Sequence, residues 1–334
     1  MALTPFSRIR HVGDLALHLG CSPEELLHFA NTQPQRQFYD LLRIPKRRGR
    51  DKVRIVYRAN EESLARMHKT LAGELAPQEG EDFDECVQGF VRDRSIVTNA
   101  RKHLGCKVLL HADIQNFFES ITLAQVMSVF ETLGCNSGVA ALLGRLCTLD
   151  GFLPQGAHAS PALANRVCLH LDTDLKQLAA RHGCVYTRYA DDIAFSGDEV
   201  PEPQRVEAIL NKHGFKLRAE KCRIQRRGHS QFVTGLSVAD TQGPRYSRQA
   251  KRWLRLVLHY ASRYGLENHL KRTGRGSANP KLAYAELEGM VRFLRSVEPR
   301  TTERMNPLLA EIGFRLHADA REEAHEGEDE NGEP

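Results

Sequence analysis

The sequence predicts an α+β protein in which a small antiparallel sheet is combined with helical segments. Residues 186–197, YTRYADDIAFSG, place a short turn between two β-prone runs, which is the pattern of a hairpin. Residues 107–113, KVLLHAD, form a further apolar strand that ends in an acid. Residues 248–264 instead carry apolar side chains at helical spacing. The hairpin also raises a question about function, because the adjacent acids Asp191 and Asp192 repel each other unless a positive charge lies between them.

Length and composition are those of an ordinary globular chain. At 334 residues it exceeds the usual size of one compact core, so we expect two or three subdomains. The hydrophobic content is 41% and the charged content 27%, no stretch approaches the ~18 apolar residues of a membrane span, and the N-terminus lacks a secretory signal. The eight cysteines are scattered without a Cys-x-x-Cys pair, which favours a reduced, cytoplasmic compartment and argues against structural zinc.

Charge is distributed unevenly along the chain. The net charge is +5, but residues 318–334 contain eight acids and one arginine, so the rest of the chain carries about +12. We therefore expect an acidic, disordered tail at 318–334. The strongly basic body indicates a polyanionic partner.

Two short helices are expected near the N-terminus. The second has Ser22 as its N-cap, Pro23 as its first residue and Glu25 as the capping partner. Such a helix pair either packs as a structural element or reads DNA as a helix-turn-helix, and the pattern favours packing.

A dense basic segment follows. Seven lysines and arginines and one aspartate lie between Lys46 and Arg58. Val53, Ile55 and Tyr57 alternate after a glycine, which predicts a hairpin with one apolar and one cationic face. A cationic edge can deter aggregation, but so dense a cluster favours phosphate contact.

Helical and extended patterns fill the middle of the chain. Asp113 stands where the 107–113 strand stops, a position suited to a helix cap or to a functional group. The further expected elements are helices at 62–75, 121–134, 138–147 and 203–214, a Pro/Gly loop feeding a long helix within 151–183, a short strand at 215–220 followed by Lys221, and a strand at 231–238.

From Ser247 the chain is helical again. At 100° per residue, its basic side chains fall within a sector about 80° wide, and an apolar set on the opposite side is expected to pack. The basic side chains are Arg248, Arg252, Arg255, His259 and Arg263, and the packing side chains are Ala250, Trp253, Val257, Ala261 and Tyr264. Because no acid interrupts the basic stripe, we expect it to contact backbone phosphates.

Three carboxylates stand at the ends of strands. If the 107–113 strand lies beside the hairpin, Asp113, Asp191 and Asp192 converge, which is costly unless a divalent cation neutralises them. Mg²⁺ prefers oxygen ligands and keeps waters and substrate phosphates around it. Two such ions, about 4 Å apart, serve an in-line phosphoryl displacement. The three acids are therefore candidate ligands for two Mg²⁺ ions.

Four segments in this order resemble the palm motifs of reverse transcriptases: DIQNFF at 113–118, LPQGAHASP at 153–161, YADD at 189–192 and FKLRAEKC at 215–222. Two others are similar to motifs of retron reverse transcriptases, NARKH at 99–103 to Asn-Ala-x-x-His and VTG at 233–235 to Val-Thr-Gly. The resemblance runs from about Phe38 to Val238. It implies a right-hand polymerase fold with fingers at 1–108 (with 125–150 interleaved), a palm with an antiparallel sheet at 109–238 and a helical thumb at 239–317.

The resemblance also implies roles for single residues. Asp113, Asp191 and Asp192 would hold the metal ions, and Lys221 would protonate pyrophosphate. The implied nucleotide-binding residues are Lys46, Arg47, Arg54, Phe118 (as the steric gate against a 2′-hydroxyl), Gln155 and Gly156. The implied RNA-binding residues are Asn99, His103, Val233, Thr234 and Gly235, beside Arg248, Arg252, Arg255 and Arg263 of the basic stripe. The finger segment is longer and more basic than the usual Lys-x-x-Gly-x-x-Arg, so its triphosphate-binding lysine is ambiguous.

The implied activity is RNA-directed DNA synthesis. The enzyme would copy part of its cognate non-coding RNA from an RNA 2′-hydroxyl, using dNTPs, to give branched RNA-linked single-stranded DNA (msDNA). Host RNase H would trim the template, a separate effector protein would act with it in phage defence, and no membrane would be involved. Two alternatives stay open: another bacterial reverse transcriptase, either group II intron-like or a template-free defence polymerase, and a non-catalytic RNA-binding protein on a polymerase scaffold.

Overall fold

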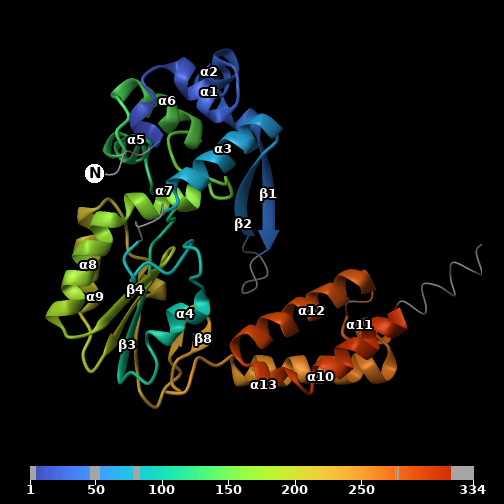
Figure 1. Ribbon diagram of the computed structural model, residues 1–334. Coiled ribbons are helices and arrows are strands. Elements are labelled where there is room, and N and C mark those ends of the chain that lie inside the picture. Colours follow the sequence, from blue (N-terminus) through green and yellow to red (C-terminus); the bar gives the residue numbers. More distant parts are fainter. Residues whose placement is uncertain (1–4, 46–52, 78–82, 275, 277, 317–334) are drawn as a thin grey trace, which may run out of the picture. The chain divides into compact units, whose positions relative to one another are not determined.

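The computed structural model describes residues 5–45, 53–77, 83–274, 276 and 278–316 (Figure 1). The chain divides between Thr234 and Gly235 into two compact units, and each is described by itself. The tail expected at 318–334, and Lys46 and Arg47 of the basic segment, lie outside the described residues.

Four antiparallel strands form the main sheet of the first unit, in the order β4-β5-β3-β6. They are β3 (Val108–Asp113), β4 (Val185–Tyr189), β5 (Asp192–Gly197) and β6 (Arg223–Arg226). The strand and the hairpin expected from the sequence are thus confirmed. The strand expected at 215–220 is wrong: Leu217 forms an isolated bridge with Ile114, and the chain then turns through η3 (Ala219–Lys221).

The two faces of this sheet have different surroundings. On one face Leu110, Ile193 and Phe195 are fully buried in the large core of the unit. The opposite face carries Asp113 and Asp192, which are paired across β3 and β5. Because side chains alternate along a strand, the acids lie on the face turned away from that core.

Helices lie on both sides of the sheet. Figure 1 shows α8 (Leu169–Arg181) and α9 (Pro203–Lys212) on one side, and α4 (Ile96–Arg101) on the other. The long helix expected within 151–183 is divided at Cys168 into α7 (Ser160–Val167) and α8. These helices therefore cover the sheet from both faces.

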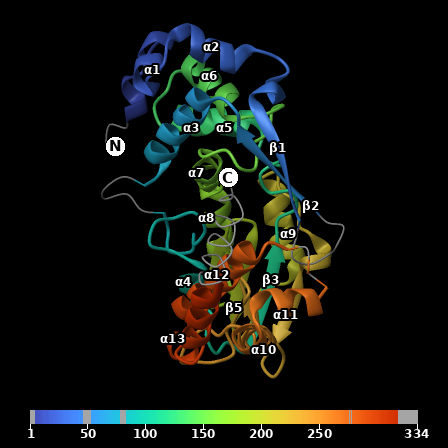
Figure 2. The same cartoon turned by 90° about the vertical axis from the view of Figure 1, so that its right-hand side faces the viewer.

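A helical layer forms one end of the first unit (Figure 2). It contains η1 (Pro5–Arg8), α1 (Val12–Leu19), α2 (Pro23–Asn31), α3 (Glu62–Leu75), α5 (Leu123–Thr132) and α6 (Ser137–Cys147). The expected N-cap is confirmed, since the Ser22 side chain accepts a hydrogen bond from the Glu25 N–H at 3.1 Å. Leu26 of α2 is fully buried, so this helix packs as a structural element of the core.

After η2 (Gln35–Phe38), a long hairpin extends from the helical layer (Figure 1). It pairs β1 (Tyr39–Pro45) with β2 (Val53–Ala59), from Tyr39 opposite Ala59 to Pro45 opposite Val53. The expected hairpin is confirmed, but its apolar face is not covered. Leu41, which lies opposite Tyr57, and Val53 and Ile55 are 41–49% exposed.

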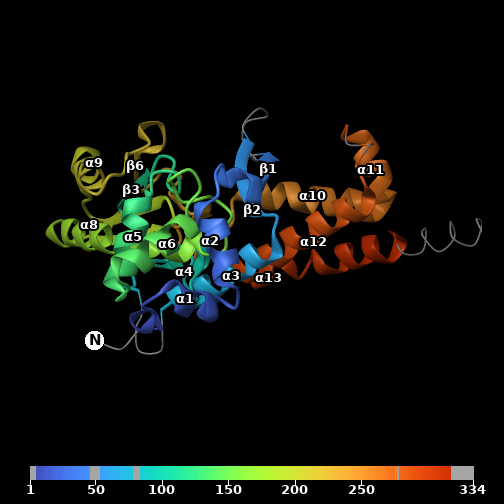
Figure 3. The same ribbon diagram turned by 90° about the horizontal axis from the view of Figure 1, so that it is seen from above.

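The second unit is helical and has its own core. It contains β8 (Leu236–Ser237), α10 (Arg248–Tyr264), α11 (Leu266–Arg272), α12 (Pro280–Val297) and α13 (Pro299–Thr302). Leu258, Leu294 and Ile312 are almost fully buried in that core. Figure 3 shows α10 and α12 side by side. The strand expected at 231–238 is interrupted after β7 (Phe232–Val233), because Thr234 and Gly235 have φ values of 45° and 85° that turn the chain.

Among the described helices none is long and apolar enough to cross a membrane. All eight cysteines are free thiols.

Candidate active site

The main chain brings the three acids to one end of the sheet. Asp113 is the last residue of β3 and lies opposite Asp192 of β5. The strands stay together beyond that pair, because the Ile114 N–H donates to the Asp191 carbonyl at 2.9 Å. On the other side, the Arg218 N–H donates to the Asp113 carbonyl at 2.8 Å. The sequence expectation that the 107–113 strand lies beside the hairpin is therefore confirmed.

The hairpin has a two-residue turn. Ala190 and Asp191 alone connect β4 to β5, with Tyr189 opposite Asp192. Ala190 adopts a φ of 58°, a left-handed conformation that most residues with a side chain avoid. The turn holds the Asp191 carboxylate close to Asp192 and Asp113, and surrounding contacts must keep it there.

Positive side chains already neutralise Asp113. The carboxylate is buried and forms an ion pair with Lys221, and Arg218 Nη1 lies 2.8 Å from its Oδ1. Arg218 does not point an N–H along a hydrogen-bond direction, so Oδ1 has no hydrogen-bond donor. Sequence reasoning found Lys221 but missed Arg218, for which the segment FKLRAEKC was the available signal.

His111 is a further residue that sequence reasoning missed. It lies two residues before Asp113 and therefore on the same face of β3. Its Nε2 is 3.3 Å from Asp192 Oδ1. Burial opposes the charged imidazole, but the Asp192 carboxylate outweighs burial and raises the pKa of His111 above its ordinary value.

The acids interact strongly enough to change protonation. Burial, followed by the charges of Asp192 and Asp113, raises the pKa of Asp191 to about 6. A cation among the three carboxylates would offset this repulsion and lower that pKa. The charge state of Asp191 therefore depends on what is bound at the site.

The donor set fits a hard divalent cation, although the ligands are not yet gathered around one point. No three acidic, histidine or cysteine side chains form a closed metal-binding group within the part of the chain that the structure describes. The Asp113 carboxylate is instead engaged by Lys221 and Arg218. Its buried Oδ1 without a donor and the mutual repulsion of the carboxylates are both relieved by a cation with oxygen preference.

A buried ion pair supports the hairpin from its other face. Arg188 of β4 is fully buried and donates to both oxygens of Asp172 in α8, Nε to Oδ1 at 2.7 Å and Nη2 to Oδ2 at 2.6 Å. Tyr186 also donates to Asp172 Oδ1, at 2.7 Å. Nη1 of the same arginine lies 3.4 Å from the Ala190 carbonyl and 3.1 Å from Asn165 Oδ1. The guanidinium thus ties the acid-bearing turn to α7 and α8.

The residues expected to bind the nucleotide come from separate elements. Phe118 is half-buried, with its ring 5.3 Å from that of Phe117 and 6.1 Å from that of Phe90. The Tyr57 N–H of β2 donates to the Gln155 carbonyl at 2.8 Å. Gly156 follows with a φ of 114°, and a Cβ there would lie 2.4 Å from Val56 Cγ1. The loop 155–156 is therefore fixed to the β1–β2 hairpin, on which Arg54 is exposed.

Comparison with known proteins decides the family. Residues 44–268 match the family described as reverse transcriptase (RNA-dependent DNA polymerase). Over 321 residues the chain is 36% identical to the retron Mx65 reverse transcriptase of Myxococcus xanthus, covering 87% of this chain and 69% of that protein. The chain belongs to the retron reverse transcriptases. The fold expected from the sequence, the α+β right-hand polymerase fold, is that of this family, and the dependence on divalent metal ions is general to it.

Other relatives are more distant. The chain is 30% identical to the retron Mx162 reverse transcriptase of Myxococcus xanthus over 323 residues, covering 85% of this chain and 63% of that protein. It is 30% identical to the retron Ec86 reverse transcriptase of Escherichia coli over 205 residues, covering 60% of this chain and 63% of that protein. A telomerase structure from Candida albicans, in complex with a telomeric RNA fragment, aligns with a TM-score of 0.45 and 11% identity over 82% of this chain and 58% of that one.

The two retron-like motifs of this reverse transcriptase lie next to each other on the sheet. Asn99 and His103 are each 1% exposed, as is Val233. The Thr234 hydroxyl donates to the Ile96 carbonyl of α4 at 3.3 Å. His103 shares hydrogen bonds with the hydroxyls of Ser196 on β5, at 2.6 Å, and Thr187 on β4, at 2.7 Å.

The burial of these motif residues limits what they can touch. Asn99, His103 and Val233 do not reach the surface, and His103 ties the loop after α4 to the sheet through Ser196 and Thr187. Thr234 is half-buried, and Gly235 has a φ of 85° with open space around it. These buried side chains can affect RNA recognition only by positioning the exposed residues around them.

The helix of the basic stripe forms as expected, with one difference. The Ser247 side chain caps α10 by accepting from the Ala250 N–H at 3.1 Å, and Val257 and Ala261 pack in the core. Trp253 and Tyr264, which were expected on the packing face, are wrong: they are 46% and 47% exposed. The basic side chains are all exposed, namely Arg248, Arg252, Arg255, His259 and Arg263.

Proposed function

We propose that this chain is an RNA-directed DNA polymerase that copies part of a structured, cognate non-coding RNA into DNA. Synthesis begins at a 2′-hydroxyl of that RNA, and the product is msDNA, single-stranded DNA joined to RNA through a branch. The observation that carries this is the register of Asp113 opposite Asp192, beside the Asp191 turn, in a chain of the retron reverse transcriptases.

The acids would position the reacting groups. Asp113, Asp191 and Asp192 would hold two Mg²⁺ ions, which supply Lewis-acid stabilisation of charge on the transferring phosphoryl group. The attacking hydroxyl gives up its proton to solvent while its oxygen forms a bond to the α-phosphorus of a dNTP, and the bond from that phosphorus to the pyrophosphate oxygen breaks. Lys221 would give a proton to the leaving pyrophosphate, which requires that its ammonium release Asp113.

Residues around the acids would select the nucleotide. Arg54, with Lys46 or Arg47, would bind the triphosphate. The Phe118 ring, held by Phe117 and Phe90, would leave no room for a 2′-hydroxyl and so exclude ribonucleotides. The loop of Gln155 and Gly156 would line the template side, because its contact with β2 fixes the main chain there. These roles rest on the position of each residue relative to the family motifs.

The RNA partner would be held by the second unit and by the surface that the retron-like motifs support. The exposed arginines of α10 provide positive charge without acids on the same face. Host RNase H would remove template RNA, since the family motifs account for polymerisation alone. A role in phage defence with a separate effector protein, in the cytoplasm, completes the proposal.

The experiment uses the purified chain with RNA transcribed from the DNA upstream of its gene, dNTPs and Mg²⁺. DNA that stays attached to RNA until the RNA is digested is the expected product. Asp191→Asn should reduce product at least about 100-fold, because it removes a charge worth several kcal/mol to the transition state, and should leave RNA affinity within about twofold. Chelation of Mg²⁺ should have the same effect as the substitution.

Asp198→Asn is the matched control. Asp198 is an exposed acid that pairs with Lys107 at 2.9 Å just after β5, and its loss should leave product formation unchanged. Equal product from any primed template would favour a general reverse transcriptase. No product from wild-type protein, with RNA binding intact, would favour a non-catalytic RNA-binding scaffold.

A further inference from the structure

One face of α10 carries exposed apolar side chains that the polymerase chemistry does not use. Trp253, Leu256, Tyr260 and Tyr264 are 46%, 54%, 43% and 47% exposed. Their spacing of three, seven and eleven residues from Trp253 puts them in one stripe about 80° wide and about 16 Å long. We call this stripe the aromatic ridge. Contiguous exposed apolar surface of this kind is typical of interaction sites, whereas single exposed apolar side chains are common on any protein surface.

The rings of the ridge are already arranged for stacking. Tyr260 and Tyr264 lie nearly parallel, with ring centroids 6.0 Å apart and planes inclined by 23°. The Arg263 guanidinium carbon is 5.7 Å from the centre of the Tyr264 ring, within the range of a cation–π contact. Because the rings contact one another, little side-chain entropy is lost when a further flat group stacks on them.

The ridge borders the basic stripe. On the helix, the ridge lies between the buried face of Leu254 and Leu258 and the face that carries Arg252, Arg255 and Arg263. Within the described residues, none of these three arginines forms an ion pair with an acid. Proteins that bind single-stranded nucleic acids combine aromatic side chains, on which bases stack, with cationic side chains, which contact phosphates. The ridge and the basic stripe provide both on one helix.

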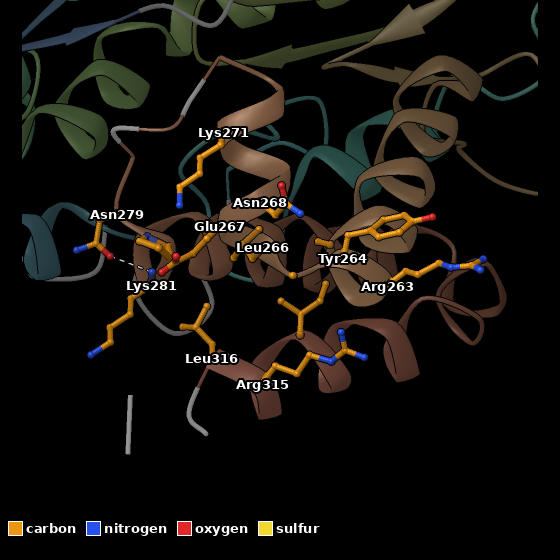
Figure 4. Close-up of a pocket in the computed structure, with 14 residues that line it drawn as sticks. Arg263, Tyr264, Leu266, Glu267, Asn268, Lys271, Asn279, Lys281, Arg315 and Leu316 are labelled. Carbon is orange, nitrogen blue, oxygen red and sulfur yellow. Dashed lines mark hydrogen bonds between the residues drawn. The ribbon is translucent and has the colours of Figure 1, made fainter. Parts of the chain in front are cut away.

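The C-terminal end of the ridge meets a pocket of about 700 Å³ (Figure 4). Arg263 and Tyr264 line it on one side, and Lys271 and Lys281 lie on the other side in Figure 4. Its volume is within the range of about 300–1,000 Å³ that small ligands occupy. Asn268 adds an exposed amide that can bond the edge of a base.

We infer that the aromatic ridge and its pocket bind unpaired RNA. Bases of a single-stranded segment stack on Trp253, Tyr260 and Tyr264, their phosphates contact the basic stripe, and the pocket accepts one nucleotide at the end. A duplex gains little from the ridge, because its bases stack on each other and offer it only phosphates. A protein partner is disfavoured, since Arg252, Arg255 and Arg263 border the ridge and α10 carries no acid. The inference rests on the proposed function in so far as the natural ligand is the cognate RNA.

Trp253 provides the test, because it is the only tryptophan in the chain. The full chain, without dNTPs or metal, is titrated with a 12-nucleotide unstructured RNA and with a 12-base-pair RNA duplex while Trp emission is followed. We expect the single strand to quench emission and to bind at least about tenfold more tightly than the duplex at equal salt. Tyr260→Ala and Tyr264→Ala should each weaken single-strand binding by about tenfold, the usual effect of removing a stacking ring, and leave duplex binding unchanged.

Two controls separate stacking from charge and from unspecific apolar contact. Phe314→Ala removes a side chain that is 77% exposed in the same unit but lies outside α10, and it should change nothing. Arg252→Glu with Arg255→Glu should weaken both RNAs and flatten the dependence of affinity on salt. Equal binding and quenching by duplex and single strand, or quenching without any effect of the two tyrosines, would overturn the inference.

The test is independent of polymerisation. The inactive Asp191→Asn variant should show the same quenching as the wild type. For the wild-type chain, quenching without DNA synthesis would refute the proposed function alone, and DNA synthesis without quenching would refute the ridge alone. If a tyrosine variant does not fold, the comparison of single strand with duplex on the wild-type chain still decides.

Discussion

Gly89 lies against the turn that carries Asp191. A Cβ at this position would be 2.5 Å from the Ala190 nitrogen and 3.0 Å from the Tyr189 carbonyl carbon. The carbonyl of Gly89 also accepts a hydrogen bond from the Asn165 side chain at 2.9 Å. Both contacts are with main chain or a buried amide, so neither neighbour can move away cheaply. The absence of a side chain at one residue therefore fixes the place of the turn that carries Asp191.

Gly89→Ala should slow DNA synthesis at least tenfold, because it displaces Ala190 and with it the Asp191 carboxylate. Single-turnover nucleotide incorporation per folded molecule is the measurement. Gly73→Ala is the matched control: Gly73 lies within α3 and nothing is within 4 Å of a Cβ built there. That variant should keep full activity and gain up to about 1 kcal/mol of stability. Similar rates for both alanine variants would contradict the proposed role of Gly89.

The sequence was most informative about residues whose chemistry is visible in a motif. Asp113 was located because an apolar strand stops there, and Asp191 and Asp192 because they are adjacent in a hairpin turn. Arg188 and Arg218 were missed, although both contact or support these acids. Their partners are 16 and about 100 residues away in the chain, and nothing in local periodicity says which arginine will be buried against which acid.

At the scale of elements, a buried ion pair between Arg188 and Asp172 supports the strained turn of the β4–β5 hairpin. Arg188 and Asp172 are 0% and 4% exposed in their side chains, so neither charge is solvated. Removing one partner of such a pair costs about 3–5 kcal/mol, because the other is left uncompensated. The guanidinium also reaches the Ala190 carbonyl. Loss of the ion pair should therefore destabilise the turn that holds the acids.

Asp172→Asn should therefore lower the rate of incorporation at saturating dNTP more than it lowers the affinity for dNTP. It should also increase hydrogen exchange in residues 185–197, because the hairpin loses its support. The matched control is Glu298→Gln, which breaks a comparably buried pair with Lys251, 2.8 Å apart, in the second unit. An equal loss of rate in both variants would show that general destabilisation, rather than positioning of the turn, is responsible.

Elements with a clear periodicity of apolar side chains were predicted well. Elements whose conformation depends on single main-chain contacts were not. The helix at 248–264 was found in full, because its capping serine and its apolar period agree. The exposure of Trp253 and Tyr264 was not predicted. Periodicity shows which side chains share a face of the helix, but it does not show whether that face is buried or exposed. The 215–220 segment is rich in β-prone residues, yet it only bridges Ile114 before turning into η3.

At the scale of the whole molecule, two units with separate cores carry out separate parts of the proposed task. The first holds the acids at one end of its sheet, and the second presents positive charge and aromatic rings on one helix. The +5 net charge of the chain hides this arrangement, because the acidic residues at 318–334 offset the basic body. Unfolding of such a chain need not follow one transition, so stability is best measured in each unit separately.

Two buried histidines make the first unit sensitive to acid. Burial lowers the pKa of His68 to about 4, and burial with the nearby Lys102 charge lowers the pKa of His103 to about 4. In the unfolded chain both titrate near 6.5, so between about 6.5 and 4 the unfolded state binds more protons and stability falls as pH falls. Each histidine accounts for roughly 3 kcal/mol over this range. Asp191 acts in the opposite direction, because its pKa is raised to about 6, and it offsets only part of the loss.

We therefore expect the first unit to lose stability as pH falls from about 6.5 to 4, and His103→Gln to weaken that dependence. Glutamine can still bond the Ser196 and Thr187 hydroxyls but cannot take up a proton. Hydrogen exchange of the β4 and β5 amides reports the first unit, while Trp253 emission reports the second. His68→Gln tests the same argument at an independent site, where the ring contacts the Leu146 carbonyl at 3.1 Å. If both glutamine variants keep the wild-type dependence of β4 and β5 exchange on pH, the buried histidines are not its cause and the carboxylates must be.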